Sequence, residues 1–126
     1  MGPAQRRWPL VVGLEPAGLE LLETAELVEG VRRTGRRVGR GRTGVVTVST
    51  GEASLIADLA PRTGIDLPPI PPAARDAILA DLPTMGYIGN PLDPWGADDP
   101  PAAYGACFRA MAASDAYDVL VLVHDF

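Results

Sequence analysis

Three short segments carry the residue types that could do chemistry. The first, STGEAS at 49–54, ends a β-branched run and turns at once into a helical pattern. A helix start presents free N–H groups and the positive end of the helix dipole, so this corner predicts a phosphate site. A helix cap is the other interpretation, because a serine and a glutamate stand at the S-x-x-E spacing of a capping box. The residues of this corner are Ser49, Thr50, Gly51, Glu52, Ala53 and Ser54.

The other two segments are GNPLDPWG at 89–96 and VHDF at 123–126. Asn90 and Asp93 can hydrogen-bond neighbouring backbone while the prolines restrict the path of the chain, so we expect a rigid supporting loop. His124 stands beside Asp125 as in an acid–base pair. Adjacent strand residues point to opposite faces, however, which argues against catalysis by His124. We therefore assign no catalytic residue.

The composition excludes several classes of protein. The chain has 126 residues, a net charge of −5, one cysteine and one histidine. A structural zinc site needs about four cysteine or histidine ligands, and one cysteine with one histidine cannot supply them, so no metal site is expected. All eleven basic residues are arginine. Without lysine the chain has neither a Schiff-base residue nor a Walker-type phosphate loop, which weakens the case for a small nucleotide-binding protein.

Charge and hydropathy also narrow the expected partners. The longest apolar run, Val119–Val123, is too short to cross a bilayer, and the first residues show no signal-peptide pattern. We therefore expect a cytoplasmic protein with no membrane partner. Six arginines lie between residues 32 and 42, interleaved with glycines. A nucleic-acid patch is one interpretation, but the glycines and the acidic remainder favour a solvated connector with no nucleic-acid partner.

Strands and helices alternate along the predicted chain. Apolar runs predict strands at 11–14, 44–48, 65–67, 87–88 and 119–123, and amphipathic patterns predict helices at 18–33, 52–63, 71–82 and after residue 100. This order indicates an α/β fold, flavodoxin-like or Rossmann-like, with a parallel sheet and helices on both faces. Because the chain stops directly after the strand at 119–123, which should also be central in such a sheet, we expect the fold to be incomplete at its C-terminus.

Some elements carry more detailed predictions. The unbroken apolar run at 44–48 predicts the central strand, buried on both faces. The helix that follows is predicted to end at Gly64 and to turn Leu55, Ile56 and Leu59 inward. In the helix after residue 100, the apolar positions at helical spacing are Tyr104, Cys107, Phe108 and Met111.

Several segments together resemble the ADP-forming (NDP-forming) acyl-CoA synthetases, relatives of succinyl-CoA synthetase. They are GLEPAGLELLETAELVEGV, VVTVSTGEASLIADLAPRTGIDLPPIP, ILADLP, GNPLDPWG and YDVLVLVHDF, within residues 11–126. The resemblance is to the flavodoxin-like ligase domain of these multidomain chains. It implies a lead-in, helix and Arg/Gly-rich connector over 1–42, followed by a flavodoxin-like CoA-ligase domain over 43–126 that is truncated after its fourth strand.

In the family that this chain resembles, an acid, CoA and ATP give acyl-CoA, ADP and phosphate through a phosphorylated histidine. The resemblance implies that the helix beginning at 49–54 faces this phosphohistidine, while the loop of Asn90 and Asp93 supports it. The implied partners are the CoA-binding, phosphohistidine and ATP-grasp domains of the ligase. CoA, and ATP or ADP with Mg²⁺, are then expected only in the complete ligase, and no cofactor is expected to bind this chain tightly.

The chain also departs from the family pattern. Thr50-Gly51 stands in place of the common Gly-Gly pair, and Glu52 stands where a neutral residue is frequent. The Ser-His-Thr-Gly segment that holds the phosphorylated histidine in relatives is missing. We therefore expect an accessory domain of an acid–thiol ligase that is inactive alone. The alternative is a stand-alone, non-catalytic binding or scaffold module that forms a homo-oligomer through an exposed sheet edge.

Overall fold

A computed structural model describes residues 10–14, 41–94 and 97–123. Their strands are β1 (Leu10–Leu14), β2 (Thr43–Val46) and β3 (Val119–Val123), and their helices are α2 (Thr50–Thr63), α3 (Pro72–Asp81) and α4 (Pro100–Ala112). The predicted helix at 18–33, the arginine-rich connector up to residue 40 and the His124–Asp125 pair lie outside the described residues.

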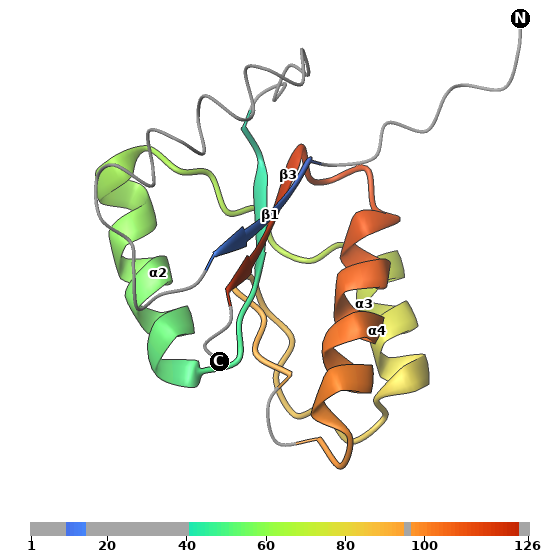
Figure 1. Ribbon diagram of the computed structural model, residues 1–126. Helices are drawn as coiled ribbons and strands as arrows, with labels where there is room; N and C mark the ends of the chain where they lie inside the picture. The colour runs from blue at the N-terminus through green and yellow to red at the C-terminus, as the bar shows by residue number, and fades with distance from the viewer. Residues whose placement is uncertain (1–9, 15–40, 95–96, 124–126) are drawn as a thin grey trace, which may run out of the picture.

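The three described strands form one parallel sheet in the order β1-β3-β2. The registers of β1 and β2 on β3 both begin at Val119, which pairs with Leu10 on one side and with Thr43 on the other. Figure 1 shows α2 on one face of the sheet and α3 with α4 on the other face. The predicted α/β class, with a parallel sheet between helices, is confirmed.

Among the described strands, the prediction that residues 44–48 form the central strand is wrong, because β3 lies between β1 and β2, and the central place expected for the run at 119–123 is confirmed. An apolar run indicates that a strand is buried but does not say which strands lie beside it. The outer edge of β2 meets loops instead, through single bridges from Arg42 to Asp66 and from Val46 to Leu92.

Two short predicted strands are not formed. The strand predicted at 65–67 is reduced to the bridge at Asp66, and residues 87–88 are irregular. Prolines limit how far pairing can extend beyond each segment, because a proline has no N–H for a ladder hydrogen bond and is largely excluded from paired strands. Prolines follow the first segment at positions 68, 69, 71 and 72, and the second at positions 91 and 94. Within 43–123, the described strands are therefore β2 and β3.

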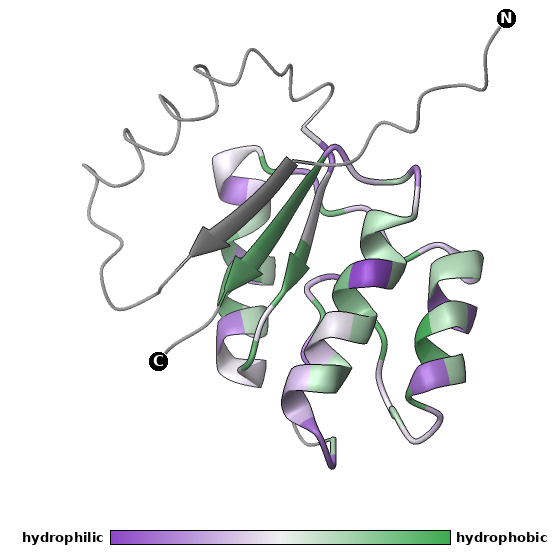
Figure 2. Ribbon diagram, turned by 45° about the vertical axis from the view of Figure 1, so that its right-hand side comes forward, coloured by the Kyte–Doolittle hydropathy of each residue, from purple (hydrophilic) through white to green (hydrophobic). Residues whose placement is uncertain are grey.

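The main core lies between the sheet and the α3–α4 layer. Its buried members are Val46, Ile78, Ile88, Leu92, Cys107, Met111, Tyr117 and Leu120. Figure 2 shows β2 and β3 in the colour of hydrophobic residues, beside helices along which hydrophobic and hydrophilic residues alternate. The predicted inward face of α4 is confirmed, because Cys107 and Met111 are fully buried and Tyr104 and Phe108 pack against the core.

The orientation of α2 differs from the prediction. Only Ala60 of this helix is fully buried, whereas the exposed fractions of Leu55 and Leu59 are 58% and 41%. The inward placement of these two leucines was therefore wrong, while Ile56 is half-buried. Ile56 and Ala60 are four residues apart and share a helix face, and the two leucines lie one step around from it. The apolar stripe of α2 is wider than the part of the helix that packs against the rest of the protein. A hydropathy pattern does not show which edge of such a stripe is buried.

The end of α2 is confirmed. Gly64 adopts φ 74°, in the left-handed region, and its N–H donates to the Ala60 carbonyl. Glycine occupies this conformation without steric cost, which is why it ends helices so often. In the described part of the chain, no helix is long and apolar enough to cross a membrane.

Candidate functional site

Thr47 connects the carboxyl end of β2 to the first turn of α2. It is fully buried, and its hydroxyl donates to Glu52 Oε2 at 2.6 Å. The Ser49 N–H donates to Thr47 Oγ1 at 3.4 Å, and Ser49 Oγ accepts from the Glu52 N–H at 3.4 Å. Ser49 is thus the N-cap of α2, as predicted. The other half of the predicted capping box is wrong, because the Ser49 N–H bonds to Thr47 rather than to the Glu52 carboxylate.

The first turn of α2 faces outward beyond this cap. Thr50 and Gly51 are exposed, whereas Glu52 and Ala53 are half-buried. The first N–H groups of a helix have no partner within the helix, and they carry the positive end of its dipole. The Glu52 carboxylate is held by Thr47. The exposed N–H groups of Thr50 and Gly51 are therefore the part of the predicted phosphate site that a visiting group can approach.

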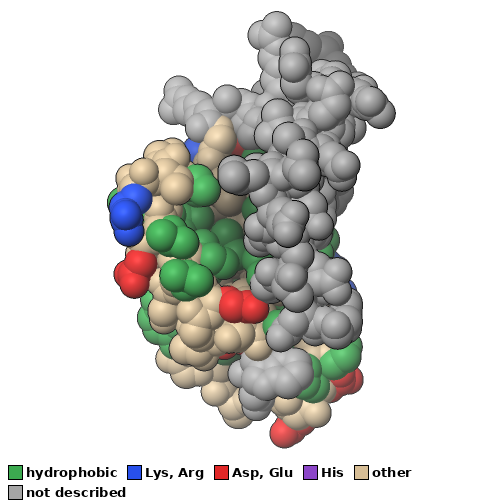
Figure 3. All heavy atoms as spheres, turned by 60° about the vertical axis from the view of Figure 1, so that its left-hand side comes forward, with side chains coloured by type: hydrophobic (Ala, Val, Ile, Leu, Met, Phe, Trp, Pro, Cys, Tyr) green, Lys and Arg blue, Asp and Glu red, His purple; other side chains and the backbone are tan. Residues whose placement is uncertain are grey.

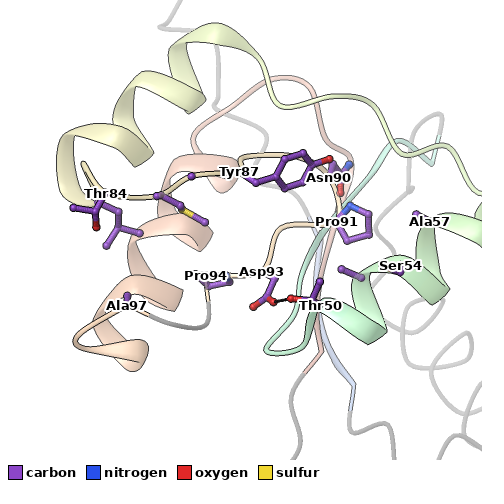
Figure 4. A pocket seen from close by; sticks show the side chains of 14 residues that line it. Thr50, Ser54, Ala57, Thr84, Tyr87, Asn90, Pro91, Asp93, Pro94 and Ala97 are labelled. Atoms are coloured by element: carbon purple, nitrogen blue, oxygen red, sulfur yellow. Dashed lines mark hydrogen bonds between the residues drawn. The ribbon is translucent and has the colours of Figure 1, made fainter.

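Asp93 brings a carboxylate to the same corner. The Thr50 hydroxyl donates to Asp93 Oδ2 at 2.7 Å, although the two residues are 43 positions apart in the sequence (Figure 4). A carboxylate beside a helix N-terminus is stabilised by the helix dipole. The structure therefore brings together the two segments that the sequence singled out separately.

Asn90 attaches the Asp93 loop to the edge of β2. Its Oδ1 accepts from the Val45 N–H at 3.0 Å, and its Nδ2 donates to the Thr43 carbonyl at 2.9 Å and to the Pro68 carbonyl at 2.8 Å. The sequence suggested bonds to neighbouring backbone, but these partners are distant along the chain. The loop carrying Asp93 is thereby held against both β2 and the proline-rich segment.

A cavity of about 590 Å³ lies between α2 and the loops before α4. Its walls come from one side of α2, from the segment after α3 and from the loop before α4, and Figure 4 shows side chains from all three around one space. The lining residues are 50, 53, 54 and 57, then 82 and 84–87, then 90, 91, 93, 94 and 97. Asp93 is the charged residue among the described lining residues. No site residue was predicted in the wall at 82–87, which includes the exposed Tyr87. ILADLP of the resemblance reaches only its first two residues, so the place of this wall in the fold is what reveals it.

Tyr104 lies at the carboxyl end of the sheet, near the start of α2. Its hydroxyl is 3.3 Å from the Val46 carbonyl and 3.4 Å from the Val123 carbonyl. Burial, with a further contribution from the Glu52 carboxylate, raises the pKa of Tyr104 to about 12. Tyr104 therefore remains a protonated hydrogen-bond donor at neutral pH.

The described residues provide binding groups more readily than reactive ones. Cys107 is fully buried, and its burial raises the pKa of the thiol to about 11, so almost no nucleophilic thiolate exists at neutral pH. No group of three metal-ligating side chains occurs within the described ranges. No protein-family model matches the chain, and no curated protein matches it. What the corner offers to a ligand is N–H groups, hydroxyls and one carboxylate.

Proposed function

We propose that this chain is a flavodoxin-like accessory domain of an ADP-forming acyl-CoA synthetase. In this proposal the start of α2 receives the phosphoryl group of a phosphohistidine supplied by a partner domain. The complete ligase converts an acid, CoA and ATP into acyl-CoA, ADP and phosphate. This chain contributes hydrogen-bond donors that position the phosphoryl group, and the partner domains contribute the histidine and the substrates.

The meeting of residues 49–54 with residues 90–93 is the observation that carries this proposal. Both segments belong to the resemblance, and both border the cavity beyond the carboxyl end of β2. Ligands of open parallel sheets collect at this end of the strands. The exposed N–H groups of Thr50 and Gly51 suit phosphoryl oxygens, because helix N-termini bind such groups without a lysine.

The Asp93 carboxylate affects how strongly an anion binds there. It lies 2.7 Å from the Thr50 hydroxyl, so a phosphoryl group at the helix start has a like charge nearby. Two like charges about 4 Å apart near a protein surface repel by about 1–4 kcal/mol. We therefore expect free phosphate to bind weakly. A phosphohistidine delivered by a docked domain overcomes this repulsion through its high effective concentration.

Titration of the full chain with inorganic phosphate, followed by amide NMR, tests the site. We expect shifts concentrated at residues 50–54. Asp93→Asn keeps an oxygen that accepts from the Thr50 hydroxyl but removes the charge, so phosphate affinity is expected to rise about tenfold. The matched control is Asp76→Asn, at an exposed position of α3, which should leave the affinity unchanged. Shifts confined to the arginine-rich connector, or no gain from Asp93→Asn, contradict the proposal.

The accessory role has a separate kinetic test. The purified chain, mixed with carboxylic acids, CoA and ATP, is expected to consume no ATP. Robust acid- and CoA-dependent turnover refutes the non-catalytic assignment. Absence of both turnover and phosphate binding favours the alternative, a stand-alone scaffold module.

A further inference from the structure

The outer side of α2 carries a row of exposed side chains that no described element covers. Leu55 and Leu59 expose 58% and 41% of their surface, and Ile65, just beyond the helix, exposes 48%. Asp58 and Arg62 are also exposed, and helical spacing puts them beside the two leucines. Figure 3 shows hydrophobic side chains gathered on this side of the molecule, with acidic and basic side chains next to them.

We propose that this surface joins two copies of the chain in a symmetric dimer. We call it the α2 patch, and it consists of Leu55, Asp58, Leu59, Arg62 and Ile65. Exposed large apolar side chains scattered singly are ordinary, whereas several on one face mark an interaction surface. A partner surface that matches the α2 patch must have an apolar stripe with one acidic and one basic side chain beside it. A second copy of the α2 patch has these features.

The order of charges along α2 is self-complementary. A two-fold axis level with residue 60 packs two α2 helices antiparallel and brings the two Leu59 side chains close to each other across the axis. Asp58 then lies across from the partner's Arg62. The same axis brings Leu55 toward the partner's Ile65. In a two-fold interface each contact occurs twice, so one acid and one base on the same stripe form two opposite-charge pairs.

The two leucines of this interface lie away from the cavity. Ser54 and Ala57 line the cavity, and they lie on the side of α2 away from Leu55 and Leu59. The dimer proposal therefore does not depend on the function proposed above. It also differs from self-association through a sheet edge, because the helix face rather than a strand forms the contact.

Sedimentation equilibrium of the full chain over a range of concentrations, with charge-exchange variants, tests the proposal. We expect a monomer–dimer equilibrium. Asp58→Arg and Arg62→Asp should each raise the dissociation constant at least about tenfold by placing like charges opposite one another. The double variant Asp58→Arg/Arg62→Asp should restore it to near the wild-type value. Asp76→Arg, at an exposed position of α3, is the control and should have no effect.

The restoration in the double variant separates lost pairing from misfolding, and far-UV circular dichroism checks the fold of each single variant. A chain that stays monomeric up to millimolar concentration overturns the proposal. A dimer that is insensitive to all three α2 variants also overturns it and assigns the contact to another surface, such as a sheet edge.

Discussion

The Asn90 side chain replaces part of a neighbouring strand at the edge of β2. It bonds the Val45 N–H, the Thr43 carbonyl and the Pro68 carbonyl at once. A primary amide has one acceptor oxygen and two N–H donors, so both ends of the side chain are used. Because Asp93 is three residues further along, these bonds also determine where its carboxylate lies relative to α2.

Replacement of Asn90 tests this arrangement. We expect Asn90→Ala to lower the free energy of unfolding by about 2–3 kcal/mol, because three half-buried backbone groups lose their partner. The measurement is urea denaturation, in which the midpoint should fall while the slope stays constant. The control is Ser54→Ala, at an exposed residue lining the cavity, which should change stability by less than about 0.5 kcal/mol. Equal midpoints for the two variants contradict this role.

At the scale of elements, Gly44 allows β2, β3 and α4 to pack closely. A Cβ atom at this position would lie 2.6 Å from Leu120 Cδ2 of β3 and 2.8 Å from Met111 Cε of α4. Both neighbours are fully buried core residues. The absence of a side chain at residue 44 is therefore what permits this three-way contact.

A methyl group at residue 44 should disturb that contact. We expect Gly44→Ala to destabilise the protein by about 1–3 kcal/mol through overpacking. Gly86→Ala is the matched control, because a Cβ at Gly86 meets nothing within 4 Å. Thermal unfolding monitored by circular dichroism compares the two variants, and about 1 kcal/mol corresponds to a shift of roughly 4–8 °C in a small domain. A Gly44→Ala variant as stable as Gly86→Ala shows that Leu120 and Met111 move aside.

At the scale of the whole molecule, polar contacts connect segments that are far apart in the sequence. The Arg42 guanidinium donates two hydrogen bonds to the Asp118 carboxylate, at 3.0 and 3.1 Å, and the Arg42 backbone N–H donates a third at 3.1 Å, so this residue joins the segments that precede β2 and β3. The Tyr117 hydroxyl lies 3.3 Å from both the Pro68 and the Pro69 carbonyls. These contacts hold the proline-rich segment against the end of the sheet where its strands begin.

The buried tyrosines predict loss of stability in alkaline solution. Burial raises the pKa of Tyr117 to about 12, and Tyr104 shifts to about the same value, from an ordinary value of 10.0. A raised pKa means that the folded state holds the proton more tightly than the unfolded state. The resulting stability is complete below pH 10 and is lost as the pH rises toward 12.

We expect the free energy of unfolding to fall by about 2 kcal/mol over this range because of Tyr117 alone. The measurement is urea denaturation between pH 9 and pH 12 in about half-unit steps. Tyr117→Phe should reduce the loss between pH 10 and 12, and Tyr104→Phe/Tyr117→Phe should leave mainly the loss between about pH 9 and 11 that the buried Cys107 thiol contributes. A double variant with the full alkaline loss rules out the tyrosines as its cause.

Local residue signals were sufficient to predict most of the element boundaries. Ser49 and Gly64 predicted the two ends of α2, the apolar run Val119–Val123 predicted β3, and the spacing of Cys107 and Met111 predicted the buried side of α4. These features are encoded by nearby residues, because caps and side-chain periodicity act within one or two turns of the chain. The alternation of helices and strands then led to the correct α/β class.

The outer place of β2 beside β3, the outward turn of Leu55 and Leu59, and the bond from Thr50 to Asp93 could not be predicted in this way. A periodic pattern shows which side of an element is apolar, but not which element comes to lie against it. Contacts between residues 43 positions apart depend on how the intervening chain folds back. The candidate site therefore contains segments that the sequence indicated one by one, and their meeting in one cavity is a product of long-range packing.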